Sequence, residues 1–135
     1  MRLNERRTAR PIVDPAAAWN LGDMPDVADL RERIGAACAR AASGNPGAGL
    51  LADLEALLAE GYICALQGDR ARSRLEKRLA ALVEASDGEA SADEFRAVAR
   101  GQRAVSEATQ QLRADLAVMR AHWAALGGER QLGAA

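Results

Sequence analysis

The chain has 135 residues, of which 32 are Ala, 17 are Arg and 16 are Leu, and its formal net charge is only −1. This length suits a single domain. Val, Ile and Thr together number 11, which is too few to supply several strands, so the composition excludes a β protein. The balanced charge argues against a nucleic-acid partner, because general nucleic-acid binders carry a clear basic excess. We therefore expect an all-α protein whose Ala-rich helices approach one another closely.

The sequence also argues against a membrane protein and against a metal-binding protein. No apolar run approaches the ~20 residues that cross a bilayer, and the Arg-bearing start of the chain leads into Pro11 without the apolar stretch of a secretory signal. We therefore expect a cytoplasmic protein with no membrane partner. Two cysteines, Cys38 and Cys64, and a single histidine, His122, cannot form a tetrahedral zinc site by themselves. We expect no metal and no cofactor.

Residues 1–22 are expected to form an extended N-terminal arm, because Pro11 and Pro15 interrupt them and their apolar side chains lack helical spacing. Trp19, Leu21 and Met24 are expected to fold back over the rest of the protein. Residues 23–135 then form one helical domain.

Capping residues and glycines divide this domain into three predicted helices, over residues 24–43, 46–87 and 92–126. Asp23 and Asn45 can cap the first two, each with a proline in the first turn, and Ser91 opens a capping box with Glu94. Each helix is expected to stop at a glycine: Gly44, Gly88 and Gly127.

The first predicted helix carries one apolar face, formed by Val27, Leu30, Ile34, Cys38 and Ala41. The third carries ten residues at alternating spacings of three and four: Phe95, Val98, Gln102, Val105, Thr109, Leu112, Leu116, Met119, Trp123 and Leu126. This is the pattern of a coiled-coil seam with two polar interruptions. The second helix offers a matching seam: Leu51, Leu54, Leu58, Gly61, Ala65, Gly68, Arg72, Leu75, Leu79 and Leu82.

Folding these two long helices antiparallel about Gly88 pairs residues whose numbers sum to 177. Leu58 then meets Met119, and Leu82 meets Phe95. In the middle, Gly61, Ala65, Gly68 and Arg72 oppose Leu116, Leu112, Thr109 and Val105, so we expect a waist where the backbones approach or the seam loosens.

The first half of the second helix has the wider apolar face, through Leu50 and Leu57. We expect the first helix to pack antiparallel on that half. The predicted fold is thus a long antiparallel helical hairpin with a three-helix bundle at one end. Beyond about Leu66 and Val105, a two-helix coiled-coil finger projects.

Catalytic chemistry is not indicated by these residues. His122 precedes a seam residue and lacks a nearby carboxylate and nucleophile. Cys38 and Cys64 are expected to act as small apolar fillers that are too far apart for a disulfide bridge. We therefore expect no enzymatic activity.

A basic band is the first candidate binding surface. Arg70, Arg72, Arg74 and Arg78 lie close together in the sequence, and Arg100 and Arg103 should lie across the hairpin. Arg72 occupies a seam position, where its charge would have to reach water or meet an anion. The alternatives are an anion-binding site and a solvated face held by partners such as Asp69 and Glu107.

An apolar surface is the second candidate. Tyr62 and Ile63 belong to no seam, and we expect them to be buried against the first helix or the arm, the alternative being an exposed partner patch. A groove near Tyr62, Ile63, Met119 and Trp123 is the expected site for an amphipathic helix of a partner protein.

A family resemblance is carried by Leu50, Leu51, Asp53, Leu54, Glu55, Leu57, Leu58 and Glu60, followed by Ala65, Leu66, Gln67, Gly68, Asp69, Glu76 and Lys77. This segment looks like the first long helix of FlgN-type flagellar export chaperones. The segment with Arg96, Ala99, Arg100, Gln102, Arg103, Ala108 and Leu112 is similar to their second helix. The resemblance covers about 75 residues and implies a chaperone that keeps hook-filament junction subunits soluble. Residues 1–49 have no counterpart in the family, and no cargo-binding residue can be transferred.

The resulting expectation is a non-enzymatic cytoplasmic chaperone or adaptor that binds a helical protein partner. Two alternatives remain open. One is a regulatory hairpin that binds an anionic ligand or a transcription factor through the basic band. The other is a structural subunit of a larger assembly, whose arm reaches a neighbouring chain, and a homo-oligomer is compatible with each.

Overall fold

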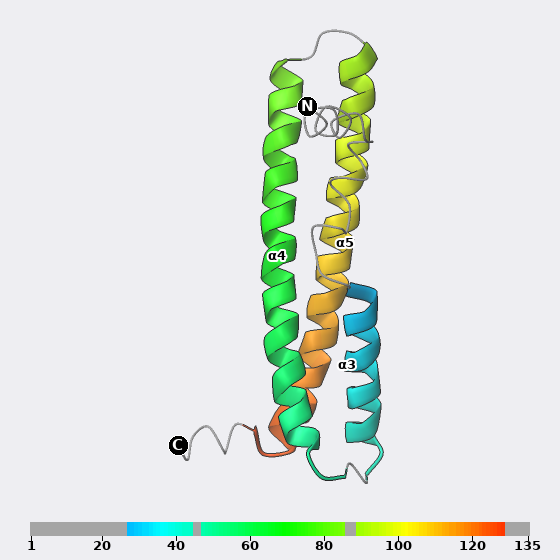
Figure 1. Cartoon of the computed structure of the whole chain (residues 1–135), viewed down its shortest axis with the longest axis vertical. Helices are drawn as coiled ribbons and strands as arrows, with labels where there is room; N and C mark the ends of the chain where they lie inside the picture. The colour runs from blue at the N-terminus through cyan, green and yellow to red at the C-terminus, as the bar shows by residue number, and fades with distance from the viewer. Residues whose placement is uncertain (1–26, 45–46, 86–88, 129–135) are drawn as a thin grey trace, which may run out of the picture.

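The computed structural model describes residues 27–44, 47–85 and 89–128, and of residues 89–91 it describes the backbone alone. These residues form three helices, α3 (Val27–Ala42), α4 (Leu50–Glu84) and α5 (Glu89–Ala125), and no strand (Figure 1). The predicted all-α fold is confirmed. The predicted arm, with Trp19, Leu21 and Met24, lies outside the described residues.

The long helices α4 and α5 run antiparallel and side by side along the molecule (Figure 1). They contain 35 and 37 residues, so at ~1.5 Å per residue they span about 53 and 56 Å. A Cβ atom added to Gly61 would collide with a methyl group of Leu116 and lie 3.3 Å from its Cγ atom. This is one of the pairs whose numbers sum to 177, so the predicted register is confirmed at this layer.

The core runs the length of the hairpin. Its fully buried large side chains on the two long helices include Leu54, Leu75, Val98, Val105, Leu112, Leu116 and Met119. Small residues fill the middle of α4, where Ala65 and Ala71 are buried together with Gly61 and Gly68. The expected waist is thus closely packed at the Gly61 layer, and it loosens at the Arg72 layer, where a polar cleft lies between the two helices.

Helix α3 covers one half of the hairpin only (Figure 1). Its face of Val27, Leu30 and Ile34 is buried as predicted, and Cys38 and Ala41 lie at the edge of the core. Ion pairs flank this packing on both sides: the exposed pairs Arg33 with Glu60 and Arg40 with Asp53, and the partly buried pair Arg31 with Asp115. The described residues of the other half consist of α4 and α5 alone, as expected for the finger.

Two predicted helix starts are wrong. Helix α4 begins at Leu50 rather than at Pro46, because Gly47 and Gly49 both adopt a φ of 81°, a left-handed conformation that no helix contains. Helix α5 begins at Glu89, so Ser91 lies within the helix and not at the position before its first residue. Glu89 and Ala90 are good helix formers, so α5 begins two residues before Ser91.

The predicted helix ends agree more closely. Gly44 and Gly127 have positive φ angles just after α3 and α5. Helix α4 ends at Glu84, where the amide of Ala85 bonds to the carbonyl of Ala81. Asn45, Pro46 and Gly88 lie outside the described residues.

The seam also departs from prediction at three positions. Ala71 is fully buried, while Arg72, the predicted seam residue, is half-buried with its guanidinium bound to Glu76. Because Ala71 fills the core, the charge of Arg72 stays near water and avoids a large desolvation cost. Phe95 and Leu126, near the ends of the predicted seam, are more than a third exposed.

The close layer at Gly61 can be tested by substitution. Gly61→Leu should lower the free energy of unfolding by about 1–3 kcal/mol, because the new side chain must displace the buried Leu116. Gly35→Leu is the matched control, since a Cβ at Gly35 meets nothing within 4 Å and the position is exposed and helical. It should be neutral or stabilising by about 0.5 kcal/mol. Urea denaturation of both variants measures the difference, and equal effects would contradict the packing described.

Candidate functional site

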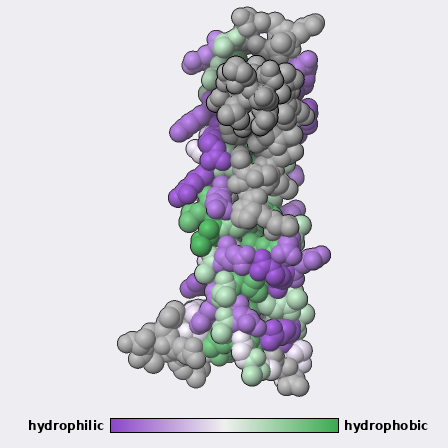
Figure 2. Space-filling view, viewed as in Figure 1, coloured by the Kyte–Doolittle hydropathy of each residue, from purple (hydrophilic) through white to green (hydrophobic). Residues whose placement is uncertain are grey.

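Four apolar residues on the outer side of α4 face solvent. Tyr62, Ile63 and Leu66 are 42, 57 and 53 % exposed, and Ala59 is exposed beside them. Their spacing places them on one helix face, on the side of α4 away from the core residues Leu58 and Ala65. We call these four residues the α4 outer stripe. Figure 2 shows strongly hydrophobic surface at mid-length on the α4 side of the molecule.

The prediction that Tyr62 and Ile63 are buried is therefore wrong, and the alternative of an exposed patch holds. The reason is the side of α4 on which α3 packs. Arg33 and Arg40 of α3 reach Glu60 and Asp53, which lie on another face of α4. Helix α3 consequently lies beside Leu57, with which its residues Ala36 and Ala37 line one pocket, and leaves the α4 outer stripe open.

Opposite charges stand at the two ends of the α4 outer stripe. Glu55 lies one turn before Ala59, and its Oε2 atom accepts a hydrogen bond of 3.1 Å from Trp123 Nε1. Arg70 lies one turn after Leu66, is exposed, and forms no ion pair with a described residue. The stripe is thus bounded by an acid at its N-terminal end and a base at its C-terminal end.

The expected groove of Tyr62, Ile63, Met119 and Trp123 is not formed. Met119 is 0 % exposed and Trp123 is 5 % exposed, because both lie on the α5 face that packs against α4. Trp123 also packs under Gly128, where an added Cβ would collide with the indole. Only Tyr62 and Ile63 of these four residues are available to a partner. Leu66 and Ala59, which complete the stripe, were not predicted from the sequence.

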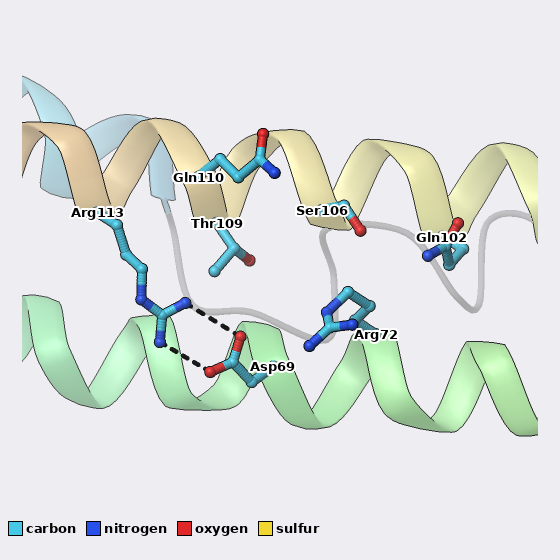
Figure 3. A pocket seen from close by; sticks show the side chains of 7 residues that line it. All are labelled: Asp69, Arg72, Gln102, Ser106, Thr109, Gln110 and Arg113. Carbon is cyan, nitrogen blue, oxygen red and sulfur yellow. Dashed lines mark hydrogen bonds and ion pairs between the residues drawn. The ribbon is translucent and has the colours of Figure 1, made fainter.

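A polar cleft of about 290 Å³ lies between α4 and α5 at the waist. Figure 3 shows the seven side chains that line it: Asp69, Arg72, Gln102, Ser106, Thr109, Gln110 and Arg113. Gln102 and Thr109 are the two polar interruptions of the predicted α5 seam, and Arg72 is the charged residue of the predicted α4 seam. The polar seam positions therefore gather in one place.

The charges in this cleft are paired within the protein. The Arg113 guanidinium donates two hydrogen bonds, of 3.1 and 2.7 Å, to the two carboxylate oxygens of Asp69 (Figure 3). These hydrogen bonds to Arg113 hold the pKa of Asp69 below its ordinary value. Arg72 donates to Glu76 at 2.9 Å, and the Thr109 hydroxyl donates to the carbonyl of Val105 at 2.8 Å. The cleft thus has no excess of positive charge with which to hold an anion.

The basic band is divided between different faces. Arg70 and Arg74 lie on the outer side of α4, whereas Arg72 lies at the cleft. Arg78 reaches across the hairpin and pairs with Glu94. Arg100 and Arg103 are exposed on α5. The described geometry does not bring these six arginines around one point, so it does not support a shared anion site.

Reactive side chains are scattered. Cys38 and Cys64 are free thiols, half-buried and buried, and burial raises the pKa of both. Within residues 27–44, 47–85 and 89–128, no group of three or more His, Cys, Asp or Glu side chains could hold a metal ion. None of the helices described is long and apolar enough to cross a membrane.

Comparisons with protein-family models, with curated proteins and with solved structures gave no match for this chain.

The Asp69–Arg113 pair predicts a pH-dependent contribution to stability. Because the folded-state pKa of Asp69 is depressed below 3.8, its ordinary value, the pair stabilises the fold above that pH and loses this effect as the pH falls through the folded-state pKa. Arg113→Gln should cost no more than about 1 kcal/mol at pH 7, since both side chains are at least a third exposed. The difference from wild type in urea denaturation should shrink towards zero at low pH. A constant difference would show that Arg113 acts through packing alone.

Proposed function

We propose that this protein is a non-enzymatic cytoplasmic adaptor or chaperone that binds a helical segment of a partner protein along the α4 outer stripe. The observation that carries the proposal is the exposure of Tyr62, Ile63 and Leu66 on one face of a helix whose opposite face is buried. Such contiguous apolar surface marks interaction sites in soluble proteins.

The chemistry of the stripe describes the partner. A helix that lies along α4 would present apolar residues at spacings of three and four, which is the helix-in-groove mode of recognition. Tyr62 suits such an interface because its ring packs while its hydroxyl remains in water at the rim. An acidic residue of the partner near Arg70 would set the direction of binding.

The narrower form of the proposal is a flagellar export chaperone, and its support is the resemblance of α4 and α5 to FlgN-type proteins. Deletion of the gene should then abolish swimming, and a hook-filament junction protein should co-purify with the chain. Normal swimming of the deletion strain would remove this narrower function and leave the adaptor role open.

Photocrosslinking tests the binding surface directly. A photoreactive phenylalanine analogue at position 62 should capture the partner in the native host, and the crosslinked peptide should belong to an amphipathic helix. The same analogue at position 118 is the control, because Val118 is also exposed, at 54 % against 42 % for Tyr62, but lies on α5. Ile63→Glu should reduce capture at position 62 at least tenfold by placing a charge in the apolar contact, which corresponds to about 1.4 kcal/mol. Capture at position 118 alone would contradict the proposal.

A further inference from the structure

The α4 outer stripe has a symmetry that a single partner does not require. A twofold axis that passes between Tyr62 and Ile63 would place a second copy of α4 antiparallel against the first. Residues whose numbers sum to 125 then face each other. Tyr62 meets Ile63 of the second copy, and Ala59 meets Leu66 of the second copy. At one end of the stripe, Glu55 meets Arg70 of the second copy. At the other end, Arg70 meets Glu55 of the second copy.

We infer that, without its partner, the protein pairs with a second copy of itself through the α4 outer stripe, as an antiparallel dimer with twofold symmetry. Twofold interfaces are the commonest in homo-oligomers and require a self-complementary surface. Here the apolar middle and the oppositely charged ends satisfy that requirement together. Like charges would meet if the two helices ran parallel in register, so the charges also select the antiparallel orientation.

The side chains at the two ends are available for this contact. Arg70 is exposed and has no ion pair with a described residue. Glu55 is exposed and engages the Trp123 indole through Oε2, which leaves Oε1 for the arginine of the second copy. Ala59 places only a methyl group opposite Leu66 of the second copy, so the two helices can approach closely.

Dimerisation would regulate the surface that the adaptor uses. A second copy and a partner helix would occupy the same stripe, so partner binding should dissociate the dimer. This competition rests on the proposed function, whereas the dimer itself does not.

Sedimentation equilibrium of the full chain tests the dimer. Wild type should show a concentration-dependent equilibrium between monomer and dimer. Ile63→Glu should raise the dimer dissociation constant at least ~100-fold, because the twofold axis places the change at the interface twice. Val118→Glu is the matched control and should leave the constant unchanged. Circular dichroism should show that both variants keep their helices. A monomeric wild type at every concentration, or a dimer that loses stability only with Val118→Glu, would overturn the inference.

A charge exchange tests the antiparallel register. Arg70→Glu should weaken the dimer about tenfold, because two ion pairs become two repulsive pairs. Adding Glu55→Arg to this variant should restore the two ion pairs with their charges exchanged. The double variant should therefore dimerise about tenfold more tightly than Glu55→Arg alone, in which two arginines face each other at each end and the Trp123 hydrogen bond is equally lost. No restoration would contradict the register.

The two proposals fail separately. A wild type that dimerises but captures no partner at position 62 keeps the dimer and removes the adaptor role. A monomer that is crosslinked to a partner at position 62 does the reverse.

Discussion

The close packing of α4 against α5 around Gly61 is the constraint on which the rest of the structure depends. Leu116 occupies the space that a side chain at Gly61 would fill, and the small residues Ala65 and Ala71 continue the contact. This layer sets the register of the hairpin and turns the face of Tyr62 and Ile63 away from the core. It also places seven polar side chains of the two helices around one cleft.

Much of the fold could be predicted from the sequence because helical spacing is a local property. The alternation of apolar residues from Val98 to Trp123 predicts one face of α5, and pairing with α4 then predicts the layer at Gly61 and Leu116. The way in which the helices pack on one another was not predictable from spacing alone. Spacing does not show on which side of α4 helix α3 packs, and that side decides the exposure of Tyr62 and Ile63.

The incorrect predictions about the binding surface have the same origin. Met119 and Trp123 were placed both in the seam and in a surface groove, and the buried seam position excludes the groove. Arg72 was placed in the seam because a strict repeat of seven was extended through the waist, whereas Ala71 occupies the core there. Leu66 is recognisable from its spacing to Ile63 and Ala59 once both are known to be exposed. The function proposed here consequently rests on a surface that the seam leaves free, rather than on the seam itself.

The register of α4 against α5 is the central claim, and the distance between paired spin labels measures it most directly. Nitroxides attached to cysteines at the exposed positions Ser73 and Arg103, in a variant with Cys38 and Cys64 replaced by Ala, should lie nearly level across the hairpin. A label at Val118 instead of Arg103 should lie about 21 Å further along the axis from the label at Ser73, because Val118 is level with Ala59, fourteen residues before Ser73. The account predicts a short distance for the first pair and a clearly longer one for the second. Equal distances, or the reverse order, would contradict it.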